Sequence, residues 1–155
     1  MIFIEGAVPS LKNSKVKTKS GIFASPAVSK FIRSLGIQSF NSRTKTIKGY
    51  VDPDRFNKLE LLRDDFKKMI GNKGHPIFIG YHQVRSSKRL FDFSNSVEII
   101  QDLFTAMDFI EDDNVKYVFP VPMTIDGELP SKENIRKKQF YSVDKENPGV
   151  WINIF

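Results

Sequence analysis

The segment from residue 76 to residue 121 constrains the fold most strongly, because it predicts a strand, a helix and a second strand in succession. Residues 76–84 (PIFIGYHQV) are mostly apolar and predict a central strand. The helix that follows is predicted to begin with Ser94 as its N-cap. Its buried face is predicted from apolar residues at helical spacing, namely Val97, Ile100, Leu103, Phe104 and Met107. Residues 115–121 (VKYVFPV) predict the second strand.

Two further helices are predicted from their start signals. Ser25 and Pro26 fit the N-cap and first position of a helix that stops at Gly36. Asp52 and Pro53 open the clearest helical pattern of the chain, which runs to about residue 70.

The remaining segments predict strands and basic connections. Residues 2–8 and 21–24 predict a hairpin, and residues 149–155 predict a last strand. Residues 10–20 are predicted to be a basic loop, and residues 37–51 an irregular basic connection. The order of elements predicts an α+β fold, with a mixed β-sheet and helices packed mainly on one face. The 155 residues are expected to form a single domain.

Composition narrows the chemistry that the chain can perform. Without cysteine, disulfides, thiolate metal sites and a cysteine nucleophile are excluded, and a reducing cytoplasm is expected. With two histidines in the chain, any metal is expected to be held by oxygen, which favours Mg²⁺ or Mn²⁺. No apolar run approaches 18 residues, so no membrane span is predicted. No organic cofactor is expected.

Charge is distributed unevenly along the chain. Residues 1–50 carry nine Lys or Arg and one acid, whereas residues 92–155 carry six Lys or Arg and twelve acids. A basic first part beside an acidic last part predicts an anion-binding surface next to an acidic centre. The N-terminal lysines fall in a predicted loop and not on an amphipathic helix, which favours nucleic acid over a membrane surface. Plain solubility charge is the alternative.

Acids lie at both ends of the predicted helix. Asp92 precedes it, and Glu111, Asp112 and Asp113 follow it, while a basic run at residues 85–89 lies just upstream. Mg²⁺ takes one or two carboxylates and neutralises charge in phosphodiester cleavage, so these acids predict a metal site. They are expected to meet if the strands before and after the helix are neighbours. Helix capping by Asp92 and ordinary turn chemistry are the alternative.

The order of these residues resembles a known family signature. The motif D-x-D-N, a helix with an acid before Leu or Met, and two acids before a strand are typical of the RusA family of Holliday junction resolvases. The matching positions are Asp92, Asn95, Asp102 and Asp112-Asp113, and the N-terminal segment from Val8 to Lys15 also resembles the family. The resemblance covers most of residues 1–122, and residues 123–155 match only loosely, as a C-terminal extension.

The resemblance implies a RusA-like fold and a Mg²⁺-dependent endodeoxyribonuclease of phage or prophage type. Such a homodimer binds four-way or other branched DNA in the host cytoplasm and resolves it by paired symmetric nicks during recombination and repair. Two positions depart from the pattern, because Ser94 replaces the second Asp and Glu98 stands where the family commonly has Lys. Glu98 lies one helical turn beyond Ser94 and is predicted to supply the missing carboxylate, with a solvated helix-face residue as the alternative.

Individual roles follow from these patterns. Asp92, Asp113 and Asp112 are the predicted metal ligands, with Ser94 and Glu98 as further candidates. Asn95 is predicted to orient a carboxylate or a water, and Lys88 to stabilise charge on the phosphate. Asp102 is as consistent with a structural role as with a catalytic one. The predicted DNA-binding residues are Lys12, Asn13, Lys15, Lys17, Lys19, Arg85, Lys88 and Arg89.

Two other functions stay open from sequence. One is a non-catalytic or weakly active DNA-binding protein on the same scaffold, with a site weakened at Ser94 and Glu98. The other is a module that binds single-stranded DNA. The second alternative is less favoured, because the phenylalanines fall mostly at helix-core or strand spacing and do not interleave with the N-terminal lysines.

Overall fold

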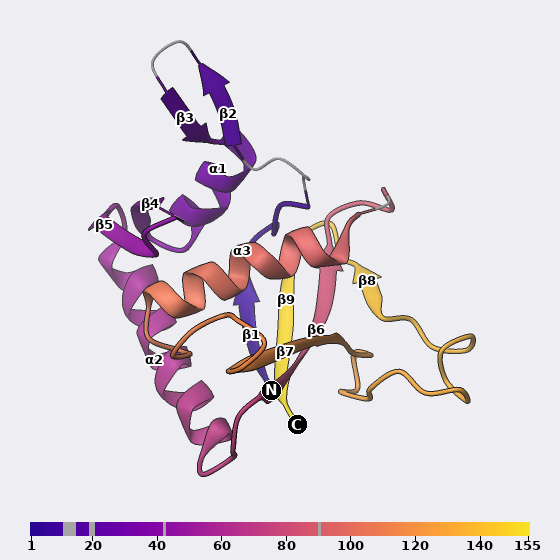
Figure 1. Ribbon diagram of the computed structural model, residues 1–155. Coiled ribbons are helices and arrows are strands. Elements are labelled where there is room, and N and C mark those ends of the chain that lie inside the picture. Colours follow the sequence, from indigo (N-terminus) through magenta and orange to yellow (C-terminus); the bar gives the residue numbers. More distant parts are fainter. Residues whose placement is uncertain (11–14, 19–20, 42, 90) are drawn as a thin grey trace.

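The computed structural model describes residues 1–10, 15–18, 21–41, 43–89 and 91–155, with the backbone alone for 15–18 and 21–24. The chain forms a small α+β domain in which three helices accompany a mixed sheet and two short hairpins (Figure 1). The helices are α1 (Pro26–Ser34), α2 (Pro53–Ile70) and α3 (Phe93–Ala106). The strands are β1 (Ile2–Glu5), β2 (Lys15–Thr18), β3 (Gly21–Ala24), β4 (Ile37–Asn41), β5 (Thr46–Tyr50), β6 (Ile77–Arg85), β7 (Val118–Pro122), β8 (Tyr141–Val143) and β9 (Gly149–Ile154).

The sheet is built around β6, as the sequence predicts. Its strand order is β1-β9-β6-β7, and β8 pairs with the far end of β6. β6 runs parallel to β7 and β8 and antiparallel to β9. The nine residues of β6 are nearly all buried, which explains why their sequence is apolar without a strict alternation.

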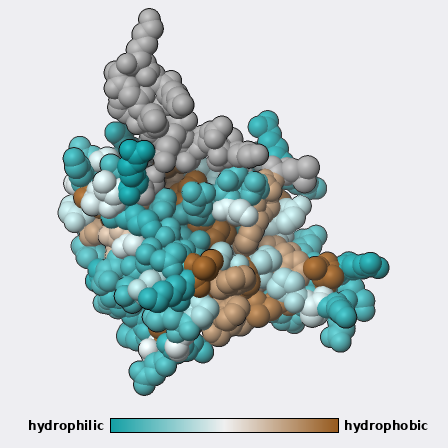
Figure 2. Space-filling model, viewed as in Figure 1, coloured by the Kyte–Doolittle hydropathy of each residue, from teal (hydrophilic) through white to brown (hydrophobic). Residues whose placement is uncertain are grey.

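The core lies between one face of this sheet and the helices. Ile4, Ile79 and Ile152 from the sheet and Ile100 and Leu103 from α3 are all buried in it. α2 joins the same core through Phe66, whose ring meets the rings of Phe104 and Phe109 at 5.1 Å and 5.6 Å. Burying each such side chain contributes about 1.5–3 kcal/mol. The outer surface of α2 is predominantly hydrophilic (Figure 2).

Each helix begins at a side-chain cap. The Ser25 hydroxyl accepts the Val28 N–H at 3.3 Å, and the Asp52 carboxylate accepts the Arg55 N–H at 3.1 Å, which confirms both predicted starts. The predicted start of the third helix is wrong by two residues, because α3 is capped by Asp92 and not by Ser94. Asp92 accepts a hydrogen bond through its side chain from a helix N–H three residues later, the usual contact of an N-cap.

Three predictions about the N-terminal half are wrong. Residues 10–20 are not all loop, because β2 pairs with β3, and β1 pairs instead with the last strand, β9. Residues 37–51 form the β4–β5 hairpin and not an irregular connection. The residues of β4 and β5 are mostly exposed. These two strands therefore lack the alternation of apolar and polar residues by which a strand is recognised in a sequence.

The C-terminal segment is part of the core. β9 lies between β1 and β6 in the sheet. Gly149 allows β9 to approach β1 closely, because a Cβ at this position would lie 2.4 Å from the Phe3 ring and 2.5 Å from the Ile4 carbonyl oxygen. Residues 123–155, which match the family pattern only loosely, therefore supply a central strand. Among the described helices, none combines the length and apolar character needed to cross a membrane.

Candidate active site

The acids that flank α3 lie at opposite ends of the sheet. β6, α3 and β7 form a parallel strand–helix–strand unit, so the segment that enters α3 follows the end of β6, and the segment that leaves it precedes the start of β7. α3 has 14 residues, which corresponds to a rise of about 20 Å. Figure 1 shows α3 crossing the sheet between these two ends. The prediction that Asp92 shares one site with Asp112 or Asp113 is therefore wrong within a single chain.

Asp92 acts at the start of α3 as a helix cap. Its side chain is exposed and accepts the Asn95 N–H at 3.2 Å, while its carbonyl oxygen accepts the Ser96 hydroxyl at 3.2 Å. Ser94 is exposed beside it. Helix capping by Asp92, the alternative to metal binding in the sequence analysis, is therefore present in the structure, and the donor is the Asn95 backbone N–H. The Asn95 side-chain nitrogen is buried and has no hydrogen-bond partner among the described residues.

A different set of acids gathers beyond the other end of α3. Asp102, from the last turns of the helix, is close enough to Asp113 for the charge of Asp113 to raise the Asp102 pKa. Asp112 accepts the Asp113 N–H at 2.7 Å and the Asn114 side-chain amide at 2.7 Å, which directs its oxygens partly toward its own loop. We call Asp102, Asp112 and Asp113 the acidic cluster.

Lys45 joins this cluster from the turn between β4 and β5. Its ammonium group lies 3.3 Å from the Asp112 carboxylate and also donates to Asp113. Desolvation opposes the charge of Lys45, but its hydrogen bonds to Asp113 and Asp112 outweigh it and raise the Lys45 pKa. Lys45 could not be identified as a site residue from the sequence, because 67 residues separate it from Asp112 and its own segment was predicted to be irregular.

The electrostatics of the cluster depend on the contact between two carboxyl groups. Burial and the negative charge of Asp113 together raise the pKa of Asp102 to about 7, against the opposing effect of Lys45. Hydrogen bonds from Asp113 and Lys45 lower the pKa of Asp112. Within the part of the chain that the structure describes, no three acidic or histidine side chains converge to hold a metal ion.

Glu98 lies one turn before Asp102 on the same side of α3. Its side chain is exposed, and its charge contributes to the raised pKa of Asp102. Glu98 therefore influences the acidic cluster and not, as predicted, a site around Asp92 and Ser94.

The basic run has two different structural roles. Arg85 is partly buried and donates to the Val8 carbonyl at 3.1 Å and the Ser10 hydroxyl at 3.2 Å, with its guanidinium 4.7 Å from the Phe91 ring centre. Burial also lowers the Arg85 pKa. Arg85 thus ties the segment after β1 to the end of β6, whereas Lys88 and Arg89 are exposed.

The other predicted DNA contacts are only partly described. Lys12, Asn13 and Lys19 lie outside the described residues, and Lys15 and Lys17 lie in β2, where the backbone alone is described. His82 is buried and bonds to the Met123 carbonyl at 3.1 Å and the Ser142 hydroxyl at 3.0 Å, which indicates a structural role.

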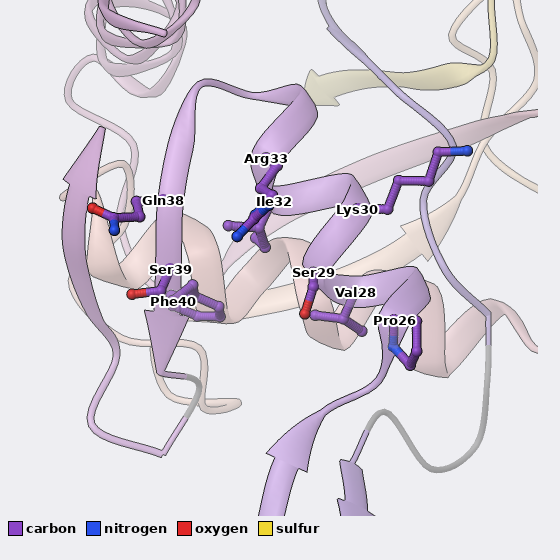
Figure 3. A pocket seen from close by; sticks show the side chains of 9 residues that line it. All are labelled: Pro26, Val28, Ser29, Lys30, Ile32, Arg33, Gln38, Ser39 and Phe40. Carbon is purple, nitrogen blue, oxygen red and sulfur yellow. The ribbon is translucent and has the colours of Figure 1, made fainter. Parts of the chain in front are cut away.

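A cavity of about 690 Å³ lies between α1 and β4 (Figure 3). Its lining contains two cations and no acid: Pro26, Val28, Ser29, Lys30, Ile32, Arg33, Gln38, Ser39 and Phe40. Figure 3 shows Arg33 extending toward the β4 side of the cavity, whereas Lys30 points away from β4. Among the described side chains, neither cation forms an ion pair. The cavity therefore offers a positively charged surface that the sequence patterns did not indicate.

Comparisons with known proteins do not identify the chain. It matches no protein-family model, and neither the curated proteins nor the solved structures contain a match to it.

Proposed function

We propose that this protein is a Mg²⁺-dependent endodeoxyribonuclease that binds four-way or other branched DNA and resolves it by paired symmetric nicks. Mn²⁺ is the expected substitute ion. The observation that carries the proposal is the acidic cluster, where two carboxylates of the loop after α3 already hold one cation, the Lys45 ammonium, close to Asp102 of the helix.

The cluster suits a hard divalent ion. Its donors are all carboxylate oxygens, and Mg²⁺ binds through one or two carboxylates with water and substrate oxygens completing its shell. Asp113 and Asp112 are the proposed ligands, with Asp102 beside them. A bound Mg²⁺ would stabilise the charge that develops on the phosphate as the bond is cleaved. A carboxyl group such as Asp102, whose pKa is about 7, also suits proton exchange near neutral pH.

The basic surfaces suit a DNA backbone. Lys88 and Arg89 are exposed, and the cavity between α1 and β4 adds Arg33 without a neighbouring acid in its lining. Such cations bind phosphates without reading sequence, which is what an enzyme selecting DNA by its branched shape needs. Paired symmetric cuts require two sites related by a two-fold axis, so we propose that the enzyme works as a homodimer. The resemblance to RusA-family resolvases supports the same assignment.

A non-catalytic DNA-binding protein is the second candidate. It is favoured by the separation of Asp92 from the acidic cluster, and by the lack of three converging ligands among the described residues. In this case the basic surfaces act alone and no metal is needed.

One pair of measurements separates the two candidates. A synthetic four-way junction is incubated with the protein and Mg²⁺ to detect nicks, and the same junction is titrated in EDTA to measure binding. The nuclease proposal expects nicks in Mg²⁺, their loss in Asp113→Asn, and binding in EDTA by both proteins. Asp64→Asn, an exposed acid on α2, is the matched control and is expected to cut normally. Binding without any nick in Mg²⁺ or Mn²⁺ would instead establish the second candidate.

A further inference from the structure

We infer that Lys45 is an internal counter-ion that competes with a divalent cation for Asp113 and Asp112, and that metal binding releases the β4–β5 hairpin from the acidic cluster. The inference rests on the proposed metal-dependent function and adds a residue that sets metal affinity.

The ion pair is partly shielded from solvent. The side chains of Lys45 and Asp113 are 26% and 24% exposed, and that of Asp112 is 41% exposed. Lys45 donates to both carboxylates at once, so its ammonium occupies the space from which a cation would contact both. Partial shielding reduces screening by solvent and salt, which makes this contact stronger than an ordinary surface pair.

The hairpin turn is organised to present Lys45. The Asn41 side chain accepts the N–H groups of Arg43 at 3.0 Å and Thr44 at 3.3 Å, and the Thr44 and Thr46 hydroxyls lie 2.7 Å apart. Lys45 itself has a positive φ of 49°, a backbone conformation that is uncommon for a residue other than glycine. These contacts hold the turn and aim one lysine away from the hairpin toward the loop after α3.

The base of the hairpin is attached independently of its tip. The Gly36 carbonyl accepts the N–H groups of Val51 at 2.9 Å and Asp52 at 3.3 Å. Gly36 has a positive φ, and a Cβ there would lie 2.3 Å from the Asp52 carbonyl oxygen, so glycine is required. The Tyr50 and Phe56 rings, 4.2 Å apart, attach the same end to α2.

The tip is held more loosely than the base. A cavity of about 380 Å³ lies between the hairpin, α2 and the end of α3, with Ile47, Arg63 and Met107 in its lining. Within the described residues, Lys45 makes the only hydrogen bonds and ion pairs that connect residues 41–50 to residues 102–117. Loss of this polar contact therefore loosens the turn around Lys45, while Phe40 and Ile47 still pack against the core and the base stays in place.

A divalent ion and Lys45 exclude each other at this position. Both need the same carboxylate lone pairs, and two cations beside the same oxygens repel each other. Binding of Lys45 and binding of the metal are linked. Because the metal weakens the contact of Lys45 with the carboxylates, Lys45 weakens the affinity of the carboxylates for the metal by the same factor. After displacement, the Lys45 ammonium moves away from the cluster with its hairpin turn and becomes available to a DNA phosphate.

Direct metal binding tests the inference without reference to cleavage. Mn²⁺ binding to the full chain is measured by the electron paramagnetic resonance signal of free Mn²⁺, without DNA. Lys45→Met is expected to bind Mn²⁺ about tenfold more tightly than the unmodified chain, which corresponds to about 1.4 kcal/mol. Lys45→Arg keeps the charge and is expected to bind nearly as weakly as the unmodified chain. Lys48→Met, which removes an exposed cation of β5, is the matched control and should change nothing.

Hydrogen exchange of the hairpin is the second readout. Mn²⁺ is expected to accelerate amide exchange in residues 43–49 of the unmodified chain, and Lys45→Met should show this faster exchange without metal. Thermal unfolding verifies that each variant is folded. Equal or weaker Mn²⁺ affinity in a folded Lys45→Met would overturn the inference and leave the proposed metal site intact. If neither the unmodified chain nor any variant binds Mn²⁺ at millimolar concentration, the proposed metal site itself is wrong, and the inference falls with it.

Discussion

Asp102 lies within the electrostatic reach of Asp113, although one belongs to α3 and the other to the loop that follows the helix. The negative charge of Asp113 disfavours ionisation of Asp102 and so raises the Asp102 pKa. Burial of Asp102 adds to this effect, and the nearby Lys45 only partly offsets it. The protonation of Asp102 therefore changes with pH near neutrality.

Stability should fall as the pH rises from about 4 to above 7. The folded Asp102 has a pKa of about 7, above that of the unfolded chain, so the folded state holds the extra proton in this window. The cost is fully present above pH 7 and absent below pH 4. Asp102→Asn removes it, and this variant is expected to be more stable than the unmodified chain at pH 8 by about 1–2 kcal/mol, a value reduced for solvent screening. Urea unfolding at pH 4 and pH 8 measures the difference, which should vanish at pH 4.

Asp113→Asn should abolish cleavage while leaving DNA binding intact. The substitution removes a charge from the centre of the acidic cluster and weakens its hold on a metal ion, with an expected loss of at least about 100-fold in cleavage rate. Single-turnover nicking of a four-way junction measures the rate, and anisotropy in EDTA measures the affinity. A normal rate in this variant would remove the acidic cluster from the mechanism.

Asp92 should behave as a helix cap in the isolated chain. Asp92→Ala is expected to lower the free energy of unfolding by about 1 kcal/mol, whereas Asp92→Asn keeps a capping oxygen and should cost only a few tenths. Because Asp92 lies at the other end of α3, Asp92→Asn should leave Mn²⁺ affinity unchanged. Calorimetric unfolding and Mn²⁺ titration measure the two effects. Loss of Mn²⁺ binding in Asp92→Asn would indicate a site completed by a second chain.

Arg85 and Arg89 should separate stability from DNA binding. Arg85→Ala loses two hydrogen bonds and a contact with the Phe91 ring, and is expected to destabilise the fold by about 1–3 kcal/mol. Arg89→Ala should not affect folding but should weaken junction binding. It should also reduce the salt slope, which is the slope of the logarithm of the binding constant against the logarithm of the salt concentration, by about 1. Unfolding experiments and binding at several salt concentrations compare the two variants. An unchanged salt slope in Arg89→Ala would place the DNA elsewhere.

Arg33 tests whether DNA uses the cavity between α1 and β4. Arg33→Gln is expected to weaken junction binding by about tenfold and reduce the salt slope by about 1, because one phosphate contact is lost. Arg55→Gln is a control on the neighbouring helix, since Arg55 is already paired with Asp52 at 3.3 Å. Anisotropy titrations at several salt concentrations measure both. Equal affinities for the two variants would show that the cavity is not part of the DNA surface.

Local signals in the sequence predicted the elements whose structure depends on near neighbours. Ser25 and Asp52 marked their helices because a cap requires only a side chain and an N–H group three residues later. The apolar stripe of α3 and the apolar run of β6 were recognised because burial determines their composition. The β4–β5 hairpin was not recognised, since its strands are mostly exposed and carry no such pattern.

Residue types and charge balance were determined by the sequence alone: carboxylates around α3, an excess of cations in the first fifty residues, and no cysteine. Which carboxylates lie together was decided only by the tertiary structure. Parallel pairing of β6 with β7 places Asp92 at one end of the sheet and Asp113 at the other, and the β4–β5 turn brings Lys45 to Asp113. Strand direction and contacts between distant segments arise from packing of the whole chain, and helical or strand periodicity carries no information about either.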